Sequence, residues 1–480
     1  MLLILGTNSI KDTGFNVANS CRFNSGSSDR LYKSQSTGNQ KTYTFSFWIK
    51  RSILSAQENI IGARYGTLGR YAFLRWNGDD PDKDKLEFHS GIYSTSSTST
   101  SMSFKTNRLF RDVSAWYHIV LAVDTTQGTE SNRVKIYVNG VQETSFTTAT
   151  YPGVNQNHFF NISTTTLEIG AQNSDSYLNA YMAEFCLIDG QQLAPTDFGE
   201  FDEDSGIGKP IDVSGLTFGT NGFYLDFEDS SALGNDANGG TDFTVNNLTA
   251  IDQTTDTPTN NFATLNPLDV FDDDGRTLSE GNLNFTTSSG NNGNISGTLA
   301  VSGSGKWYFE TKILAQSGST GSSAKFGIVG IRDLNKSTPD SAGNAYYIYS
   351  DGRKEDGANT TNSAHPGYVL NDIVQVAFDL DGGNVYFGLN GNWGNNSGSF
   401  NQTFGNATAF FTSINTGGFW SAYLNKNVTA DNVLTLSANF GSPSFSISSG
   451  NTDGDGYGNF EYAVPSGYYA LNTKNLAEYG

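Results

Sequence analysis

The strongest constraint on the fold is the stretch at 116–146, which reads WYHIVLAVDTTQGTESNRVKIYVNGVQETSF. Residues Tyr117–Asp124 alternate along the chain, and both alternating sets are largely apolar, a pattern typical of a strand inside a two-sheet sandwich. A polar loop leads to a second strand at Val134–Val138. That strand ends at Asn139-Gly140, the dipeptide that most readily adopts a type I′ hairpin turn. The stretch therefore predicts a β-hairpin within an all-β domain.

A second unit of the same kind lies much later, at Ile373–Trp393. Val374, Val376 and Phe378 alternate in its first strand, and Asn390-Gly391 ends the returning strand. No window keeps a 3.6-residue apolar period for three turns, so long helices are not expected. Because 480 residues exceed one ordinary core, the fold class predicted is all-β, with two antiparallel β-sandwich domains of jelly-roll type in tandem.

The chain divides into four predicted parts. They are an N-terminal arm at 1–14, a first sandwich at 15–253, a linker at 254–267 and a second sandwich at 268–480. The linker contains two prolines and no strand pattern. The stretch 222–248 carries short strand-like runs, and the sequence leaves open whether it completes the first sandwich or forms a small bridge between domains.

Charge and hydropathy exclude several classes of partner. The net charge of −20 disfavours nucleic acid and anionic membrane surfaces, since both need clustered Lys and Arg. No apolar run approaches the ~18 residues of a membrane span, so no membrane insertion is expected. The N-terminus lacks the basic region of a signal peptide. A composition typical of extracellular proteins without a secretion signal fits proteins released by cell lysis, such as parts of a virus particle.

The two cysteines, Cys21 and Cys186, are too few for a disulfide framework. Each lies in an alternating run, which predicts burial in a strand. Two states stay open: a pair of free, buried thiols, or one bridge if the first and last strands of the domain are neighbours.

Three motifs in order resemble a laminin G-like, concanavalin A-like jelly roll. They are the strand WYHIVLAVD, the hairpin VKIYVNG and the later strand AEFCLIDG. The resemblance covers Phe15–Leu193 and implies two curved antiparallel sheets.

Four later motifs, within Asn260–Leu476, resemble an SPRY domain. They are Gly305–Glu310, Phe326–Gly330, the hairpin Val374–Leu389 and Ser437–Gly441. SPRY domains are bent β sandwiches that bind proteins through variable loops and have no known catalytic apparatus. The resemblance therefore implies binding by the second domain.

Because concanavalin A-like folds include glucanases, we looked for paired carboxylates on one strand face. No predicted strand carries a Glu-x-Asp-x-Glu run; Glu200, Asp202 and Asp204 have the spacing but lie among glycines in a predicted loop. The four histidines have no common spacing and no ladder of Cys or Asp beside them: His89, His118, His158 and His365. A structural role is expected for His118, which lies in the hairpin strand. No catalytic residue is assigned.

One loop resembles the first part of a calcium-binding EF-hand loop. It places oxygen-bearing residues at loop positions 1, 3, 5, 7 and 9, with Gly456 at position 6: Asn451, Asp453, Asp455, Tyr457 and Asn459. Position 12 is Tyr462 rather than the bidentate Glu. Two interpretations stay open, a Ca²⁺ site and a Gly/Asp turn without metal; Asp272–Gly275 is a weaker candidate, and no other cofactor is expected.

Receptor contact, if it uses exposed loops, needs aromatic and amide side chains. Trp393 with Asn392, Asn395 and Asn396 forms one candidate group, and Trp420 is another. Packing in the core is the alternative for each tryptophan.

The two resemblances, the high Asn, Ser, Thr and Gly content and the low Lys content together resemble virion appendage proteins of tailed bacteriophages. This implies a non-enzymatic fibre, knob or head-decoration protein, located on the virion and extracellular after host lysis, that binds a host-surface glycan or other receptor. The apolar start of the arm, Leu2–Leu5, is expected to dock on other virion proteins, and a homo-oligomer is expected, with a trimer favoured. The alternatives are an architectural cement protein, a carbohydrate-active enzyme and a cellular adhesion module.

Overall fold

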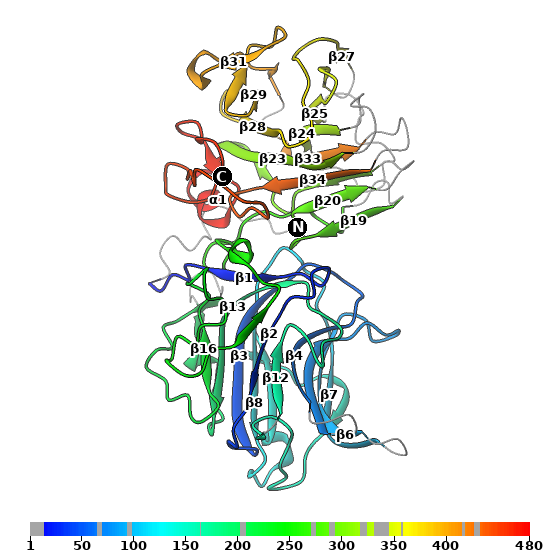
Figure 1. The fold of residues 1–480 in the computed structure, drawn as a ribbon, viewed down its shortest axis with the longest axis vertical. Coiled ribbons are helices and arrows are strands. Elements are labelled where there is room, and N and C mark those ends of the chain that lie inside the picture. Colours follow the sequence, from blue (N-terminus) through cyan, green and yellow to red (C-terminus); the bar gives the residue numbers. More distant parts are fainter. Residues whose placement is uncertain are drawn as a thin grey trace. The chain divides into compact units, whose positions relative to one another are not determined.

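The computed structural model describes residues 14–64, 70–93, 98–163, 165–201, 208–269, 275–287, 293–316, 324–330, 345–356, 359–414, 418–426 and 433–480. The predicted arm, including Leu2–Leu5, lies outside these residues except for Gly14. The predicted all-β fold class is confirmed, because antiparallel sheets dominate two compact units (Figure 1). We name them the N-terminal unit, Asp12–Thr259, and the C-terminal unit, Asn260–Gly480.

Two eight-stranded antiparallel sheets form the N-terminal unit. Sheet one has the order β10 (Val141–Gln142), β9 (Val134–Val138), β8 (Tyr117–Asp124), β3 (Thr42–Arg51), β13 (Ala180–Asp189), β1 (Ser20–Phe23) and β18 (Gln253–Thr254), with β16 (Phe223–Leu225) paired to β13. Sheet two has the order β11 (Phe146–Thr150), β7 (Thr98–Leu109), β6 (Lys85–Tyr93), β5 (Arg70–Trp76), β4 (Glu58–Arg64), β12 (Thr166–Ile169), β2 (Arg30–Ser34) and β17 (Thr244–Asn246). A separate hairpin joins β14 (Gly199–Phe201) to β15 (Gly208–Pro210).

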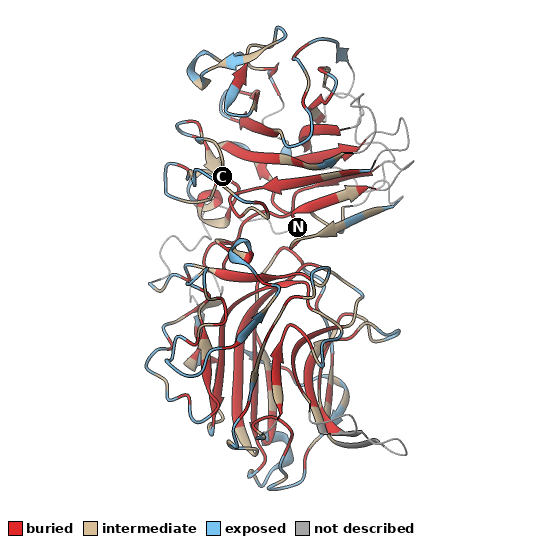
Figure 2. Ribbon diagram, viewed as in Figure 1, coloured by how far each residue is buried: buried red, intermediate tan, exposed pale blue. Residues whose placement is uncertain are grey.

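The two predicted strands are confirmed as β8 and β9, which pair antiparallel, and the predicted Asn139-Gly140 turn joins β9 to β10. Asn139 and Gly140 have φ angles of 49° and 78°, the left-handed conformations that a type I′ turn needs at both central positions. Inward-facing residues of both sheets pack together into one core, and most of the strand residues are buried (Figure 2). In β3, Tyr43, Phe45 and Phe47 enter this core, while their neighbours face the other side of sheet one.

The stretch 222–248, which the sequence left unassigned, completes the N-terminal unit. Strand β16 pairs with β13, and β17 pairs with β2, so the stretch adds one strand to each sheet. Phe223, Leu225 and Phe243 are buried in the core between the sheets.

Two further sheets form the C-terminal unit. The ten-stranded sheet has the order β19 (Arg276–Ser279), β20 (Asn284–Thr287), β34 (Leu434–Asn439), β23 (Lys306–Gln316), β28 (Ile373–Asp379), β29 (Asn384–Leu389), β30 (Asn392–Gly394) and β31 (Phe400–Gln402), with β32 (Phe411–Thr412) on β29 and β35 (Tyr469–Ala470) on β23. The seven-stranded sheet has the order β21 (Gly293–Ser296), β33 (Phe419–Lys426), β24 (Ala324–Gly330), β25 (Ala345–Tyr349), β26 (Lys354–Glu355) and β27 (Thr360–Thr361), with β22 (Val301–Ser302) on β33.

Helical structure is sparse in the described residues. The single α-helix among them is α1 (Thr473–Tyr479), and 3₁₀ turns lie at η1 (Glu130–Asn132), η2 (Pro195–Asp197), η3 (Ala250–Asp252) and η4 (Phe404–Asn406). Within the same residues, no helix combines the length and apolar character needed to cross a membrane.

The stretch predicted as a linker, 254–267, is not a solvated spacer. Its first part belongs to the N-terminal unit, where the hydroxyl of Thr259 accepts a hydrogen bond from the amide of Val17 (3.1 Å). Its second part belongs to the C-terminal unit, where the amide of Ala263 donates to the carbonyl of Leu471 (2.9 Å). The two prolines suggested a linker, but the threonines and asparagines around them are largely buried.

Both cysteines are free and buried. Cys21 faces the core between the sheets, whereas Cys186 lies in a separate cluster on the other side of sheet one. The open alternative of a bridge is therefore not realised.

Replacing Phe223 by Ala should lower the free energy of unfolding of the N-terminal unit by about 3–5 kcal/mol, because it leaves a cavity in a fully buried site. Denaturant titration of the full chain measures the change. As a control, Val245→Ala on β17, where the side chain is 37% exposed, should cost less than about 1 kcal/mol. Equal costs would mean that the stretch 222–248 does not complete the core.

Candidate functional site

The outer faces of the two sheets in the N-terminal unit differ. Two clusters of buried hydrophobic residues cover the outer face of sheet one. The first holds Val120, Ala122, Cys186, Ile188, Phe198, Val213 and Phe218, and the second holds Val17, Trp48, Trp116, Tyr181 and Ala183. In the part of the chain that the structure describes, no such cluster forms on the outer face of sheet two. That face is therefore the candidate binding surface.

Three aromatic rings form a stack on this open face. In β5, Ala72, Leu74 and Trp76 enter the core, so Tyr71 and Phe73 point outward. Phe73 is only 6% exposed, whereas Tyr71 and His89 are half-buried and therefore more accessible to a ligand. His89 on β6 lies opposite Phe73 in the antiparallel register. The ring of His89 lies 5.1 Å from that of Tyr71 and 5.4 Å from that of Phe73, and the ring planes differ by only 12° and 15°. These distances and angles describe an offset stack, which we call the ring stack.

Charged side chains of both signs surround the ring stack. The guanidinium of Arg75 lies over Phe73, 4.3 Å from its centroid, and forms an ion pair of 2.9 Å with Glu87. Farther along the face, Asp82 is paired with Lys85 (2.8 Å) and Lys105 (2.9 Å). The charges described here therefore compensate one another.

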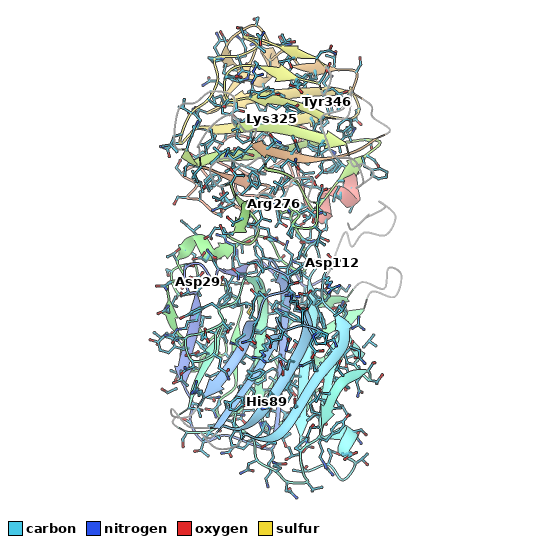
Figure 3. The ribbon with its side chains drawn as sticks, turned by 90° about the vertical axis from the view of Figure 1, so that its right-hand side faces the viewer. Asp29, His89, Asp112, Arg276, Lys325 and Tyr346 are labelled. Atoms are coloured by element: carbon cyan, nitrogen blue, oxygen red, sulfur yellow. The ribbon has the colours of Figure 1, made fainter. Side chains whose placement is uncertain are left out.

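A comparable pair lies toward the other edge of the sheet. Arg30 pairs with Glu168 (3.0 Å), and its guanidinium also lies over the ring of Tyr32, 4.9 Å from the centroid. Figure 3 labels His89 toward the lower ends of the strands that face the viewer.

Two titratable groups define the protonation state of this face. Burial lowers the pKa of His89, so the ring stack is uncharged at neutral pH. Hydrogen bonds from Lys85 and Lys105 lower the pKa of Asp82, so this carboxylate stays ionised. Nε2 of His89 is buried and has no hydrogen-bond partner among the described residues, which is unusual for a polar atom next to a surface.

Both predicted receptor-contact tryptophans are core residues. Trp393 is 4% exposed and makes an edge contact with Phe404 (4.7 Å between centroids). Trp420 is 2% exposed and lies 5.3 Å from the ring of Tyr346. The sequence placed both in loops, but the structure places them in β30 and β33, so packing is their role.

The asparagines predicted beside Trp393 mainly shape a turn. Asn395 accepts hydrogen bonds from the amides of Ser397 (2.9 Å) and Ser399 (3.2 Å). Asn396 donates to the carbonyl of Ala409 (3.2 Å), and Asn392 is exposed. Because Trp393 is buried, this group can present amide side chains to a ligand but no aromatic surface.

In the loop predicted to bind calcium, the carboxylate of Asp453 accepts hydrogen bonds from the protein itself. Asp453 is 6% exposed, and one of its oxygens accepts from the amides of Asp455 (3.0 Å) and Tyr457 (2.9 Å). The other oxygen accepts from the amide of Ala470 (3.0 Å) and the side chain of Asn475 (2.7 Å). Four N–H donors thus satisfy a carboxylate that a metal would need.

Two other predicted loop residues have hydrogen-bond partners elsewhere. Asp455 accepts from the hydroxyl of Tyr479 (2.9 Å), and the amide of Asn451 pairs with Phe460. Within the described ranges, no group of three or more His, Cys, Asp and Glu side chains gathers to hold a metal. The weaker candidate, Asp272–Gly275, lies outside those ranges except for Gly275.

The remaining histidines are structural. His118 stacks on Trp48 (4.7 Å, 15°), and its ring nitrogen Nε2 is 2.9 Å from the hydroxyl of Ser46. Burial lowers the pKa of His118 and of His158 to about 3 each, and that of His365 to about 4. Glu200, predicted to lie in a loop, is in strand β14 and forms an ion pair with Lys209 on β15 (3.1 Å). Asp202 and Asp204 lie outside the described residues.

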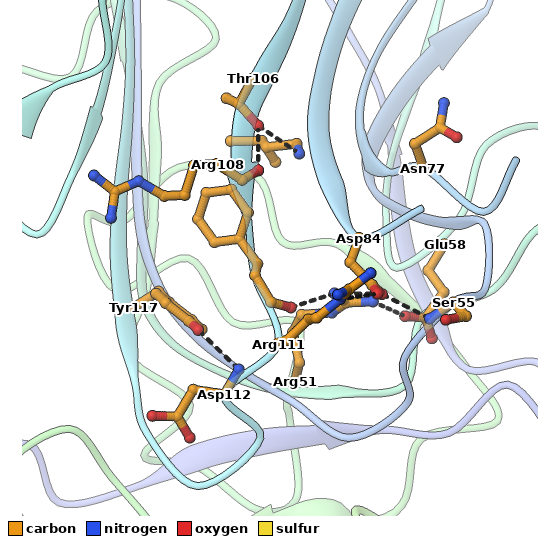
Figure 4. Close-up of polar contacts among 12 residues, drawn as sticks. Arg51, Ser55, Glu58, Asn77, Asp84, Thr106, Arg108, Arg111, Asp112 and Tyr117 are labelled. Carbon is orange, nitrogen blue, oxygen red and sulfur yellow. Dashed lines mark hydrogen bonds and ion pairs between the residues drawn. The ribbon is translucent and has the colours of Figure 1, made fainter. Parts of the chain in front are cut away.

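Sequence reasoning missed a buried charge network at one end of β3 (Figure 4). Arg51 is buried and pairs with Asp84 (3.2 Å) and Glu58 (3.8 Å), and Arg111 also pairs with Asp84 (3.0 Å). Burial raises the pKa of Glu58 to about 7, although Arg51 opposes that shift. The network ties β3 to β4 and to the turn before β6, which is a structural role.

A comparison with known protein families gives a match in the region that resembles a laminin G-like jelly roll. Residues 25–192 match the family model described as the concanavalin A-like lectin/glucanases superfamily. This match lies inside the stretch Phe15–Leu193 for which the sequence showed the resemblance, and the N-terminal unit thus contains a laminin G-like jelly roll. No curated protein sequence matches the chain.

Solved structures resemble parts of the chain at low identity. The SPRY domain of human HERC1 is 13% identical, with 36% of this chain and 96% of that chain covered and a TM-score of 0.28. A putative carbohydrate binding protein from Bacteroides ovatus is 16% identical, with 48% and 59% covered and a TM-score of 0.34. Tailspike protein 2 of the Escherichia coli O157:H7 bacteriophage CAB120 is 14% identical, with 37% and 23% covered and a TM-score of 0.26. These low scores assign no function to the chain.

Replacing Asp453 by Ala should lower the free energy of unfolding of the C-terminal unit by about 3 kcal/mol, because it leaves buried N–H donors unpaired. Thermal unfolding of the full chain measures the effect, and Asp455→Ala is the control, since Asp455 is exposed. Excess chelator should leave the melting temperature of the wild type unchanged. A melting temperature that falls with chelator and recovers with Ca²⁺ would restore the calcium interpretation.

Proposed function

We propose that the N-terminal unit binds a neutral glycan on the outer face of sheet two, at the ring stack of Tyr71, Phe73 and His89. The observation that carries the proposal is an aromatic stack, ringed by paired charges, on the sandwich face that the described chain leaves uncovered. Aromatic rings pack against the apolar C–H faces of sugar rings. The carboxylate of Glu87 and the guanidinium of Arg75 offer neighbouring acceptors and donors to sugar hydroxyl groups.

The charge pattern favours a neutral sugar over an anionic one. Arg75, Lys85, Lys105 and Arg30 each already have a carboxylate partner on the same face. An anionic glycan would have to displace one of these partners, and the chain as a whole carries a net charge of −20. A neutral polyhydroxylated ligand has neither cost.

The same face supports binding rather than hydrolysis. A glycosidase needs one carboxyl group with a raised pKa as its general acid. The pKa of Asp82 is lowered instead, and Glu87 and Glu168 are both ion paired. In the N-terminal unit, the described glutamates whose pKa is raised, Glu58 and Glu184, are buried and cannot reach a ligand on this face.

The biological setting that we propose is the surface of a bacteriophage particle. The chain would be a fibre, knob or head-decoration protein, an oligomer such as a trimer, and attached to other virion proteins through its N-terminal arm. The sequence composition and the paired laminin G-like and SPRY-like resemblances support this setting. In it, the ring stack would contact glycans on the host surface.

A glycan array probed with the purified full chain tests the binding proposal. The wild type should bind neutral glycans, and Tyr71→Ala should weaken binding by at least about tenfold, or about 1.4 kcal/mol, through loss of stacking area. Phe419→Ala is the control, because Phe419 is an exposed aromatic residue of the C-terminal unit.

Two results would contradict the proposal. A blank array with folded wild-type protein would leave only an architectural role for the chain. Binding that survives Tyr71→Ala but is lost with Phe419→Ala would move the site to the C-terminal unit.

A further inference from the structure

A buried lysine and a buried aspartate meet on the outer face of sheet one. Lys50 is on β3, and its side chain lies on the face opposite to the core between the sheets. Asp256 follows β18, the last strand of the same sheet. Both side chains are only 1% exposed, and Nζ of Lys50 contacts Oδ2 of Asp256.

Aromatic side chains enclose the pair. Nζ of Lys50 lies 5.0 Å from the ring centroid of Tyr181, and Trp116 and Tyr181 belong to the second apolar cluster that covers sheet one. Nε1 of Trp116 donates a hydrogen bond to Oδ1 of Asp256 (3.2 Å). One carboxyl oxygen therefore faces the amine, and the other faces an indole N–H.

The backbone on both sides of the aspartate is held in place. The amide of Asp256 donates to the hydroxyl of Thr254 (2.9 Å), and the hydroxyl of Ser20 donates to the carbonyl of Asp256 (2.6 Å). Lys50 is fixed in turn by the pairing of β3 with β13, where it lies opposite Tyr181. The two reacting groups are thus positioned before any reaction, which removes most of the entropic cost of bringing them together.

A site of this kind favours the neutral forms of both groups. Burial in apolar surroundings penalises an ammonium and a carboxylate alike. Burial lowers the pKa of Lys50, although the nearby Asp256 opposes the shift. Transfer of one proton from Nζ to Oδ2 converts the ion pair into an amine and a carboxylic acid, which are the reactive forms.

We propose that Lys50 and Asp256 form an intramolecular isopeptide bond. The lone pair of Nζ attacks Cγ of Asp256, a C–N bond forms, and the electron pair of the carbonyl moves to Oδ1. The indole N–H of Trp116 stabilises the negative charge on Oδ1. As the intermediate collapses, the bond between Cγ and Oδ2 breaks, and Oδ2 leaves as water with its own hydrogen and a proton from Nζ. The reaction is redox neutral and needs no co-reactant.

The bond would join positions 206 residues apart in the sequence. It would cross-link β3, a central strand of sheet one, to the segment that follows its edge strand β18. Such a link restricts the unfolded chain as a disulfide does, and unlike a disulfide it survives reducing conditions. The end of the N-terminal unit would then stay attached when the rest of the unit opens.

A second lysine–aspartate pair in the same unit offers a matched comparison. Asp236 is buried and Lys33 is half-buried, and Nζ of Lys33 lies over the rings of Phe223 and Phe243. Their closest N···O distance is 3.8 Å, beyond hydrogen-bond range. This pair should remain an ordinary ion pair.

Intact-mass measurement of the purified, denatured full chain tests the proposal. The wild type should be lighter than its sequence mass by one water, about 18 Da. Protease digestion should give a branched peptide that joins Thr42–Arg51 to the segment containing Asp256. Lys50→Arg and Asp256→Ala should each restore the full sequence mass, whereas Lys33→Arg should keep the loss of one water.

The branched peptide distinguishes the isopeptide from dehydration at another aspartate, because only the isopeptide joins two segments. Asp256→Asn gives an independent result, since the same attack would release ammonia and lower that variant's mass by about 17 Da. If Lys50→Arg fails to fold, the wild-type peptide map still decides. A folded wild type with the full sequence mass and no branched peptide would overturn the proposal.

Discussion

Face-to-face packing of two sheets is the interaction on which the N-terminal unit depends, and it leaves each sheet with an outer face to be covered or exposed. Strands of sheet one are apolar on both faces: in β8, Leu121 enters the core and Val120 faces outward. Exposing such a face would cost the hydrophobic stabilisation of several large side chains. The chain covers it with residues that follow β13, among them Phe198 and Phe218. Sheet two alternates apolar and polar residues in β6, and charged side chains flank the rings of β5, so its outer face can stay open.

Basic residues are scarce in this chain, and buried ones such as Arg51 and Lys50 contact carboxylates inside the protein. The chain has 28 Lys and Arg against 48 Asp and Glu, and several of the cations are inside the protein. Arg51 joins strands through two carboxylates, and Lys50 lies against Asp256. On the open face, the cations are paired with acids of the same sheet. The same distribution of charge explains why the surface is acidic and why an uncharged ligand fits it.

Local features of the fold could be predicted from the sequence, and nonlocal features could not. The pairing of β8 with β9 follows from alternation, and the turn between β9 and β10 follows from Asn139-Gly140; both are properties of one short stretch. The role of 222–248 depends on pairing with β13 and β2, which no local pattern reveals. The buried positions of Trp393 and Trp420 also depend on distant strands, so loop-like neighbours misled the sequence analysis. The ring stack combines β5 with β6, and its signal was the outward alternation of aromatic and charged residues in both strands.

The central claim is that the open face of sheet two, and no other surface of the described chain, carries the glycan site. Hydrogen–deuterium exchange of the full chain, with and without the strongest glycan from the array, tests it most directly. We expect added protection in β5 and β6 around Tyr71 and His89, with no change in the strands of sheet one. Protection confined to the C-terminal unit, or found nowhere at saturating glycan, would contradict the account.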